Sequence, residues 1–520
     1  MLAVPFVPFE LFDWLARVLP GAVVTFGIDL IVALISPLDL GELSAVAKAV
    51  EQALAVGIFL AAGAALGALL FGLSGTLPAR MWYPTSVVLG AAFGLAALSV
   101  SFGAASLSAT AADSSNPVVS GFWIMLTFLT WGAALAWTYR RLSSASTQHA
   151  AEAAIVQRLD RRRFLLRLGG ATAVITVAGA GLASLLRSEG RGRLDADAGS
   201  AGTWSQRNAL PNQGATVEPA PGTRPEFTLP NDHYRIDINL TPPTVAGDQW
   251  RLRVGGLVDT AREFTLEELQ NYRPMHQFIT MSCISNPLGG DLISTTRWTG
   301  VSMQRLLPDL GLVDGATHLK ISSVDGFFEI VPLETIEADE RVMLAYQWDG
   351  LPLPTENGFP LRIYVPDVYG MKQPKWIDRI EAIDDWEQGF WVVRGWDDTA
   401  RMRSTSVIDT VATDMVATGT TDSSPGAAAL VPIGGIAHAG ARGISRVEVR
   451  VDDGDWHEAR LRQPLSELTW VIWRYDWPFE AGQHTFTVRC FDGDGTPQIT
   501  ERNPVHPSGA TGLISKRARL

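Results

Sequence analysis

Cys283 lies in the segment MSCISNPLGGDLISTTRWTGV (residues 281–301), which holds no histidine and no second cysteine. A lone thiol of this kind can be a packing residue, a nucleophile or a metal ligand. A nucleophile needs a histidine base and an orienting Asp or Asn, and the nearest histidines along the chain are His276 and His318. A zinc or iron–sulfur site needs several Cys or His ligands at close spacing, which this segment lacks. A thiolate as the only protein ligand fits a metal whose other ligands come from a cofactor.

The second cysteine indicates a different environment. Cys490 shares one face of an expected strand with Phe486 and Val488, so we expect a buried core thiol. Two cysteines in separate predicted domains give no disulfide framework. The sequence has no Cys-x-x-Cys-His motif and no iron–sulfur cysteine set, so we expect neither a c-type haem nor such a cluster. The first histidine, His149, follows four of the five apolar runs described next, which excludes a bis-histidine haem within them.

Long apolar runs fill the first third of the chain, each near the length that a bilayer-spanning helix needs. They cover residues 18–36, 53–73, 86–108, 120–138 and 168–186. Asp29 is either a functional group within a membrane helix or a residue near the interface, and we favour the second role. Glycines at four-residue spacing, Gly63 with Gly67 and Gly90 with Gly94, are typical of closely packed membrane helices. We therefore predict a transmembrane helical bundle of about five spans in the cell membrane.

Arginines between these runs predict the orientation. The loop before the last run holds Arg140, Arg141, Arg158, Arg161, Arg162 and Arg163, and the loop after the second run holds Arg80. Cytoplasmic loops are enriched in Lys and Arg, so five spans would place everything after residue 187 on the extracytoplasmic side.

The start of the fifth run resembles a twin-arginine export signal. In DRRRFLLRLGG (residues 160–170), Arg161 and Arg162 precede Phe164, Leu165 and a modest apolar run. The alternative is a plain basic flank of a membrane helix. An export signal of this kind would carry an already folded domain across the membrane, as a protein loaded with a cofactor in the cytoplasm requires.

Composition divides the chain into a multidomain fold. Residues 1–186 form the predicted bundle, and residues 187–224, rich in Gly, Ala, Pro and charge, are predicted to be a flexible linker. Residues 225–404 mix short strands and helices, which indicates an α+β domain. Residues 405–520 alternate apolar and polar side chains between turns, which indicates an all-β sandwich.

Five segments together resemble the sulfite oxidase superfamily. The cysteine segment HQFITMSCISNPLGGDLISTTRWTGVSMQRLL is similar to the one in which a single Cys binds molybdenum while molybdopterin supplies two further sulfurs. The other four, in the order of the family, are FTLPNDHYRIDINLTPPTV, VDGFFEIVPL, LPTENGFPLRIYVPDVYGMKQPKWIDRIE and GFWVVRGW. The region from residue 430, which ends HPSGATGLIS, is similar to the immunoglobulin-like C-terminal domain of the family, often used for dimerisation. The resemblance covers about residues 225–515 and implies a sulfite-oxidase-type molybdopterin domain.

The resemblance also implies the site residues. Cys283 matches the molybdenum ligand. The residues that match positions holding the pterin and its phosphate are Asn357, Arg362, Gly370 and Lys372, with Asn231, His233 and Tyr234 in the first segment. A terminal phosphate needs cations such as Arg and Lys, and amides can bind the edge of a pterin. Taken singly, these residues would fit surface charges and a turn, so only the joint pattern favours the site.

The family implies oxygen-atom transfer coupled to two-electron chemistry at a molybdenum–molybdopterin cofactor, generally without a nucleotide on the pterin. The substrate would be a small oxyanion, or an S-oxide or N-oxide reduced as in the bacterial methionine sulfoxide reductases of this fold. Sulfite oxidases carry arginines just after the metal cysteine, whereas here ISNPLGGDL follows Cys283, with the acid Asp291 and no cation. Arg394, Arg401 and Arg403 are the candidates to replace them, Arg394 being the expected catalytic cation, and interdomain ion pairs are the equal alternative.

The expected partners are a small-molecule substrate, the lipid bilayer, a separate electron-transfer partner that could also lie in the membrane, and a second copy of the chain. The net charge of −12 argues against nucleic acid. An alternative from another class is a metal-free, membrane-tethered binding protein that uses its immunoglobulin-like domain. The joint presence of Cys283, Asn357, Arg362 and Lys372 favours the enzyme.

Overall fold

The computed structural model describes residues 7–21, 23, 26, 27, 30, 43–73, 81–107, 117–146, 202–413 and 430–520. These residues belong to two units, which we describe separately. The first contains most of the long helices, and the second contains residues 203–520 with the strands. Asp29, the arginine pair Arg161 and Arg162, and the predicted fifth span lie outside the described residues.

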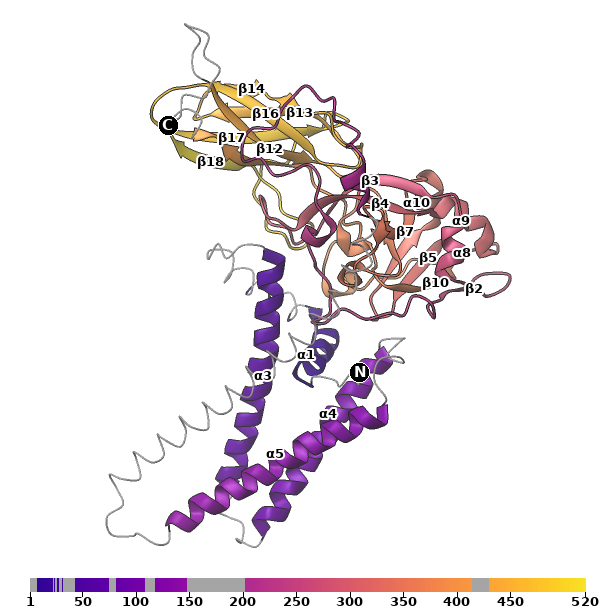
Figure 1. The fold of residues 1–520 in the computed structure, drawn as a ribbon, viewed down its shortest axis with the longest axis vertical. Coiled ribbons are helices and arrows are strands. Elements are labelled where there is room, and N and C mark those ends of the chain that lie inside the picture. Colours follow the sequence, from indigo (N-terminus) through magenta and orange to yellow (C-terminus); the bar gives the residue numbers. More distant parts are fainter. Residues whose placement is uncertain are drawn as a thin grey trace. The chain divides into compact units, whose positions relative to one another are not determined.

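Before residue 150 the structure describes the helices α1 (Val7–Val18), α3 (Leu43–Leu73), α4 (Trp82–Leu107) and α5 (Pro117–Ser146) (Figure 1). Helices α4 and α5 approach closely where Gly90 faces Gly132, because a Cβ added to Gly90 would lie 3.2 Å from the Cα of Gly132. A Cβ at Gly94 would likewise lie 2.8 Å from the sulfur of Met125, which agrees with the predicted close packing of Gly90 and Gly94. A Cβ at Gly63 would meet no described atom within 4 Å.

The bundle of about five membrane spans is not confirmed. One described helical segment, Lys48–Leu66, is long and apolar enough to cross a membrane, while Pro84–Val100 and Gly121–Ala134 are shorter apolar segments. The predicted span at 18–36 lies largely outside the described residues.

The domain that follows is α+β, as predicted, and contains two sheets (Figure 1). The first has the strand order β2-β1-β10-β5-β6 and the second β3-β4-β7-β8, with β9 paired to β7. The first sheet comprises β1 (Leu252–Gly256), β2 (Arg262–Phe264), β5 (His318–Ser323), β6 (Phe328–Pro332) and β10 (Ile377–Ile383). The second comprises β3 (Met275–Ser282), β4 (Ile293–Ser302), β7 (Met343–Trp348), β8 (Leu351–Pro352) and β9 (Arg362–Tyr364). The helices of the domain are α8 (Leu266–Gln270), α9 (Met303–Leu310) and α10 (Leu333–Ala338).

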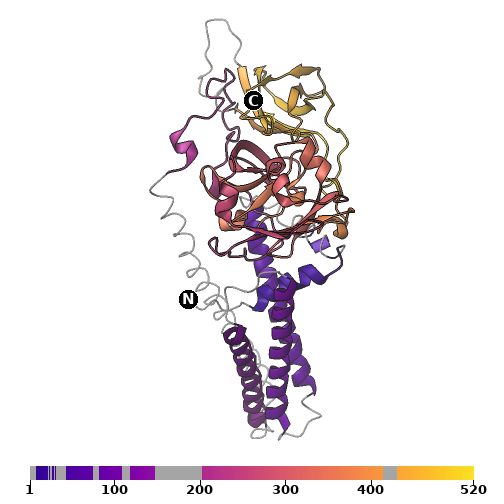
Figure 2. The ribbon, with the colours of Figure 1, turned by 90° about the vertical axis from the view of Figure 1, so that its right-hand side faces the viewer.

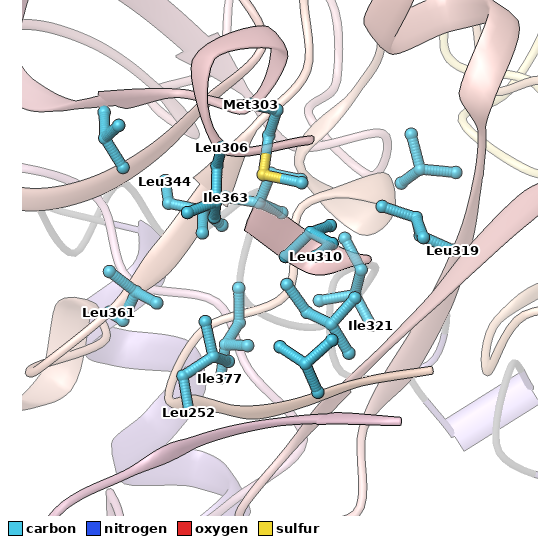
Figure 3. Close-up of a cluster of buried hydrophobic side chains, with 14 of the residues drawn as sticks. Leu252, Met303, Leu306, Leu310, Leu319, Ile321, Leu344, Leu361, Ile363 and Ile377 are labelled. Atoms are coloured by element: carbon cyan, nitrogen blue, oxygen red, sulfur yellow. The ribbon is translucent and has the colours of Figure 1, made fainter. Parts of the chain in front are cut away.

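A large apolar core holds these elements together (Figure 3). Leu306 and Leu310 of α9 pack with Leu252, Ile321 and Ile377 of the first sheet, and all five are fully buried. Helix α9 ends at Gly311, which adopts a left-handed conformation (φ 66°) that favours glycine. The core fixes the first sheet, whereas the loops of the site follow strands β3, β8 and β9 of the second sheet.

The last domain consists of two antiparallel four-stranded sheets, with the orders β11-β12-β16-β15 and β14-β13-β17-β18. Its strands are β11 (Thr405–Val411), β12 (Leu430–His438), β13 (Ile444–Val451), β14 (Trp456–Glu458), β15 (Arg460–Leu461), β16 (Val471–Pro478), β17 (Gln483–Asp492) and β18 (Ile514–Arg519). Trp473, Phe486, Val488 and Cys490 are fully buried between the sheets, so Cys490 is the predicted core thiol. These strands form a body of their own beside the α+β domain (Figure 2).

The predicted flexible linker is wrong for its described part, residues 202–224. Helix α7 (Trp204–Arg207) docks on the α+β domain, where the backbone N and the hydroxyl of Ser205 donate to Asp349 at 2.9 and 2.6 Å. Further along, Arg224 binds Asp409 of β11 at 2.7 Å. Composition indicated flexibility because Gly, Ala and Pro are frequent, but polar contacts with residues distant in sequence hold this segment, which we call the strap.

Trp204→Ala is expected to loosen the strap. The indole packs edge-on against Phe278 at 5.5 Å between ring centroids, and the guanidinium of Arg297 lies 4.6 Å from the Trp204 ring. Losing these contacts should lower the free energy of unfolding by about 2 kcal/mol. Limited proteolysis should then cleave the strap faster than in the wild type, whereas Trp386→Ala, at an exposed position, should leave the rate unchanged.

Candidate functional site

Cys283 directly follows β3 and begins the loop that leads to β4. The loop is closed by three hydrogen bonds: Cys283 N to Leu292 O at 3.0 Å, Asn286 N to Cys283 O at 3.1 Å, and Leu292 N to the side-chain oxygen of Asn286 at 3.1 Å. The thiol is buried, and its Sγ lies 3.0 Å from the hydroxyl of Ser285. Burial raises the pKa of Cys283, and the Ser285 hydroxyl offsets part of this rise. A bound metal cation would favour the thiolate in this position.

Arg362, at the start of β9, is a buried cation without a carboxylate partner among the described residues. Its guanidinium donates to Asn357 O at 3.0 Å and to the sulfur of Met281 at 3.3 Å, while its Nε has no hydrogen-bond partner. The rings of Trp298 and Trp348 lie 4.9 and 5.3 Å away. Burial lowers the pKa of Arg362 to about 10. An uncompensated buried charge is costly, so this arrangement is suited to an anionic ligand.

Lys375 is a second cation near Arg362. Lys375 was not identified as a site residue from the sequence. Its ammonium donates to Asp237 at 3.1 Å and to Glu356 O at 3.0 Å. Burial lowers the pKa of Lys375 to about 8, and Asp237 opposes this decrease. The signal was available, because Lys375 lies in LPTENGFPLRIYVPDVYGMKQPKWIDRIE, one of the segments that resemble the superfamily.

His233 and Tyr234 are buried beside these cations. The His233 ring stacks on Trp348 at 4.2 Å, its Nδ1 lies 3.1 Å from Tyr234 O, and its Nε2 has no partner. Burial lowers the pKa of His233 to about 3, and Arg362 and Lys375 add to this effect, so the ring is neutral at pH 7. A neutral imidazole with a free nitrogen suits a ligand that forms hydrogen bonds. Asn231, in contrast, is exposed.

The YGMK segment (residues 369–372) lies close to the cysteine loop. A Cβ at Gly370 would lie 3.1 Å from the hydroxyl of Tyr234 and 3.4 Å from Ser282 O, so glycine allows this approach. Lys372, expected to bind phosphate, instead forms a buried ion pair with Glu329 at 2.7 Å. Burial raises the pKa of Glu329, and Lys372 opposes the rise. The charge of Lys372 is therefore already matched, whereas that of Arg362 is not.

The three candidate arginines differ in surroundings. Arg394 is half-buried, donates to Phe390 O at 2.7 Å and lies 3.6 Å from the centroid of the Phe390 ring. Arg401 is exposed and pairs with Asp367 at 2.8 Å, which fits the ion-pair alternative. Arg403 lines a small cavity beside the cysteine loop together with residues 286–290, Tyr369 and His438. None of the residues that line this cavity is Asp or Glu.

Two alternative roles for the Cys283 thiol, a nucleophile with a histidine base and a ligand in a conventional metal cluster, can be compared with the structure. His276 bonds the Thr299 hydroxyl at 2.9 Å and His318 bonds the Thr317 hydroxyl at 2.8 Å, while the hydrogen-bond partner of the Cys283 Sγ is Ser285. Within the described part of the chain, no group of three or more His, Cys, Asp and Glu side chains could hold a metal ion. Neither a cysteine–histidine pair nor a conventional metal cluster is therefore formed by Cys283 and the described residues.

Comparison with known proteins decides the family. Residues 239–391 match the family described as oxidoreductase molybdopterin binding domain. Residues 239–391 therefore form a domain of the molybdopterin-binding oxidoreductases, and the chain resembles the sulfite oxidases. It is similar to sulfite oxidase from Gallus gallus, with 29% identity over 301 residues that cover 49% of this chain and 64% of the relative. It is also similar to mitochondrial sulfite oxidase from Macaca fascicularis, with 27% identity covering 53% of this chain and 57% of the relative. The chain thus spans only part of the length of these curated relatives.

Among solved structures, the sulfane dehydrogenase SoxCD from Paracoccus pantotrophus aligns with 58% of this chain and 82% of its own, at 21% identity and a TM-score of 0.49. The molybdopterin-binding domain at residues 239–391 implies a molybdenum–molybdopterin cofactor. The described residues fit such a group, because Arg362 Nε and His233 Nε2 are buried polar atoms without partners beside a buried cysteine.

The burial of His438, the last residue of β12, is expected to make the stability of the protein depend on pH. The residue is 3% exposed, and burial lowers its pKa from 6.5 to about 3, with Arg442 adding to the effect. The unfolded state therefore binds the proton more readily, so this contribution to stability is present above pH 6.5 and is lost as the pH falls towards 3. In urea unfolding between pH 6.5 and 4, His438→Phe should flatten the pH slope by about 1 kcal/mol per pH unit. The exposed His457→Phe is the control, and an unchanged slope in His438→Phe would contradict the prediction.

Proposed function

We propose that this member of the sulfite oxidase superfamily is an oxygen-atom-transfer enzyme in which Cys283 ligates molybdenum. The observation that carries the proposal is the uncompensated Arg362, buried with His233 and Lys375 around the loop of a buried cysteine. A structural domain gains nothing from a buried cation without a counter-charge, since the desolvation penalty is not offset. An anionic pterin cofactor would supply the missing charge.

Different residues of the site would bind different parts of such a cofactor. Arg362 would neutralise its anionic groups. Lys375 would assist, because its partner Asp237 also binds Arg235, so that one carboxylate faces two cations. His233, stacked on Trp348, would offer a hydrogen bond at Nε2. Asn286 closes the loop that orients the Cys283 thiol, and Ser285 contacts the sulfur. When bound, the cofactor supplies two-electron oxygen-atom transfer. We assign Asn357 a supporting role, because its carbonyl accepts from Arg362, and we assign Lys372 an indirect role through its pair with Glu329.

The substrate would approach the cysteine loop on the side of this small cavity, whose volume of about 30 Å³ holds about one water. Arg403 lines this cavity and donates through Nε to Ser508 O at 3.2 Å, and its two terminal nitrogens make no hydrogen bond with the described residues. A cation without nearby carboxylates favours a small oxyanion or the oxygen of an S-oxide or N-oxide. We therefore give the substrate-facing role to Arg403 in place of Arg394, whose guanidinium already donates to Phe390 O and Arg17 O.

We further propose that the amino-terminal helices anchor the enzyme in the cell membrane, with the catalytic domain on the extracytoplasmic side after twin-arginine export. The apolar segment Lys48–Leu66 and the arginine-rich loops support this proposal. Electrons would pass to or from a separate redox partner. Membranes without that partner should then turn over substrate only with an artificial electron carrier, and full activity of the purified chain without a carrier would contradict this.

The strand orders β11-β12-β16-β15 and β14-β13-β17-β18 support an immunoglobulin-like sandwich for the last domain, because they correspond to the A-B-E-D and C′-C-F-G arrangement. We propose, by analogy with the family, that this domain mediates homodimerisation. Light scattering of the detergent-purified chain tests the mass of the assembly.

The experiment that tests the function is elemental analysis of the full chain, expressed in a host that makes molybdopterin. About one molybdenum per chain, retained after gel filtration, is expected and would justify assays with sulfite, S-oxides and N-oxides. Absence of molybdenum from well-folded protein of a competent host would overturn the proposal and favour the binding-protein alternative.

A further inference from the structure

Asp367 is an unusual residue just before the YGMK segment. Its φ of 64° lies in the left-handed region, which Asp adopts only at some cost unless its surroundings hold it there. Two arginines bind its carboxylate: Arg401 at 2.8 Å, and Arg442 from the last domain. The backbone also participates, because Met402 N donates to Asp367 O at 2.9 Å. Arg401 and Met402 belong to the α+β domain, so Arg442 is the contact by which the last domain holds this loop.

Arg442 reaches the loop from the turn between β12 and β13. Besides Asp367, its guanidinium binds Asp492 of β17 at 3.1 Å and donates to Met402 O at 2.8 Å. The side chain is only 12% exposed, so these contacts are made with little competition from water. Gly440 allows the approach, since a Cβ there would collide with the Asp367 carboxylate.

The last domain also packs against Tyr369, two residues further along the loop. Tyr369 N donates to Ala400 O at 2.9 Å, and its hydroxyl accepts from Arg403 N at 3.1 Å. A Cβ at Gly509 would lie 2.5 Å from that hydroxyl, so only glycine fits this contact. Asp367 and Tyr369 thus fix the loop immediately before Gly370, which itself lies beside Ser282 and Tyr234.

We propose that Arg442 is a positioning residue: through Asp367, the last domain holds the YGMK loop in the conformation that retains the cofactor. The inference rests on the proposed function, because it takes the YGMK loop to be part of the cofactor site. Arg442 acts on the cofactor only through the loop. Its loss should therefore change the mobility of residues 365–373 even when no cofactor is bound.

The experiment compares Asp367→Asn and Arg442→Met in the full chain. Asn tolerates the left-handed conformation as well as Asp does, so Asp367→Asn removes the charge and leaves both the backbone and the Arg442–Asp492 pair in place. Arg489→Met is the matched control, because Arg489 pairs with Glu448 at 2.6 Å within the last domain. The first measurement is hydrogen exchange of residues 365–373 in cofactor-free protein, and the second is the rate at which loaded protein loses molybdenum.

Both loop variants are expected to exchange faster in residues 365–373 and to lose molybdenum about tenfold faster than the wild type, while Arg489→Met matches the wild type in both. Unchanged exchange and unchanged molybdenum loss in Asp367→Asn would overturn the proposal. Faster exchange with unchanged molybdenum loss would overturn the link between the loop and the cofactor. Absence of molybdenum from the wild type would instead count against the proposed function, and the exchange measurement would still decide whether Arg442 positions the loop.

Discussion

Cys283→Ser is expected to abolish turnover, by roughly 10³-fold or more, while the chain stays folded. In the proposed site, the Cys283 thiolate would be the ligand that the described residues offer to the metal, and a serine hydroxyl at this position neither ionises readily nor matches a soft sulfur donor. The measurement is turnover of an S-oxide with a reduced viologen dye, or of sulfite with ferricyanide. X-ray absorption should show one fewer sulfur ligand to molybdenum in the variant.

Cys490→Ser is the matched control, because it makes the same change at the other cysteine. Burial raises the pKa of Cys490 to about 12, and its Sγ lies 3.3 Å from Gln498 in the core of the last domain. This control should lose about 1 kcal/mol of stability and keep its molybdenum and turnover. Equal turnover in Cys283→Ser and the wild type would refute the assignment of Cys283.

Arg362→Met is expected to prevent cofactor binding and, in the cofactor-free protein, to raise the free energy of unfolding by about 1–3 kcal/mol. Both effects have one cause: the wild-type chain buries a cation whose counter-charge arrives with the ligand. Methionine fills a similar volume between Trp298 and Trp348 without the desolvation penalty. Urea unfolding of cofactor-free protein measures the gain, and molybdenum content measures the loss.

Arg297→Met is the control for this prediction. Arg297 is also buried, in β4 of the same sheet, but it stacks on Trp204 of the strap and bonds Thr299 at 3.4 Å. This variant should be less stable than the wild type and should keep its molybdenum. A destabilised Arg362→Met that still binds the cofactor would show that Arg362 is an ordinary packing residue.

Much of the architecture was accessible from local patterns. Alternation of Val447, Val449 and Val451 predicts β13, and the face shared by Phe486, Val488 and Cys490 predicts β17, because burial on one side of a strand imposes a period of two. Composition failed for the strap, since contacts such as Ser205 with Asp349 join residues far apart in sequence. The number of membrane spans stays a prediction.

The sequence alone supplied the prediction of the chemistry of the site, because the resemblance rests on residue types and their order: one cysteine segment, followed by NGFPLR and YGMK. Only the tertiary structure decided which cations are free to bind an anion. Among the described residues, Arg362 has no carboxylate partner. Lys372 forms an ion pair with Glu329, and Lys375 lies beside Arg362 and forms an ion pair with Asp237. The physical reason is that desolvation and ion pairing depend on which side chains the fold brings within a few ångströms, and such pairs leave no signal in local sequence.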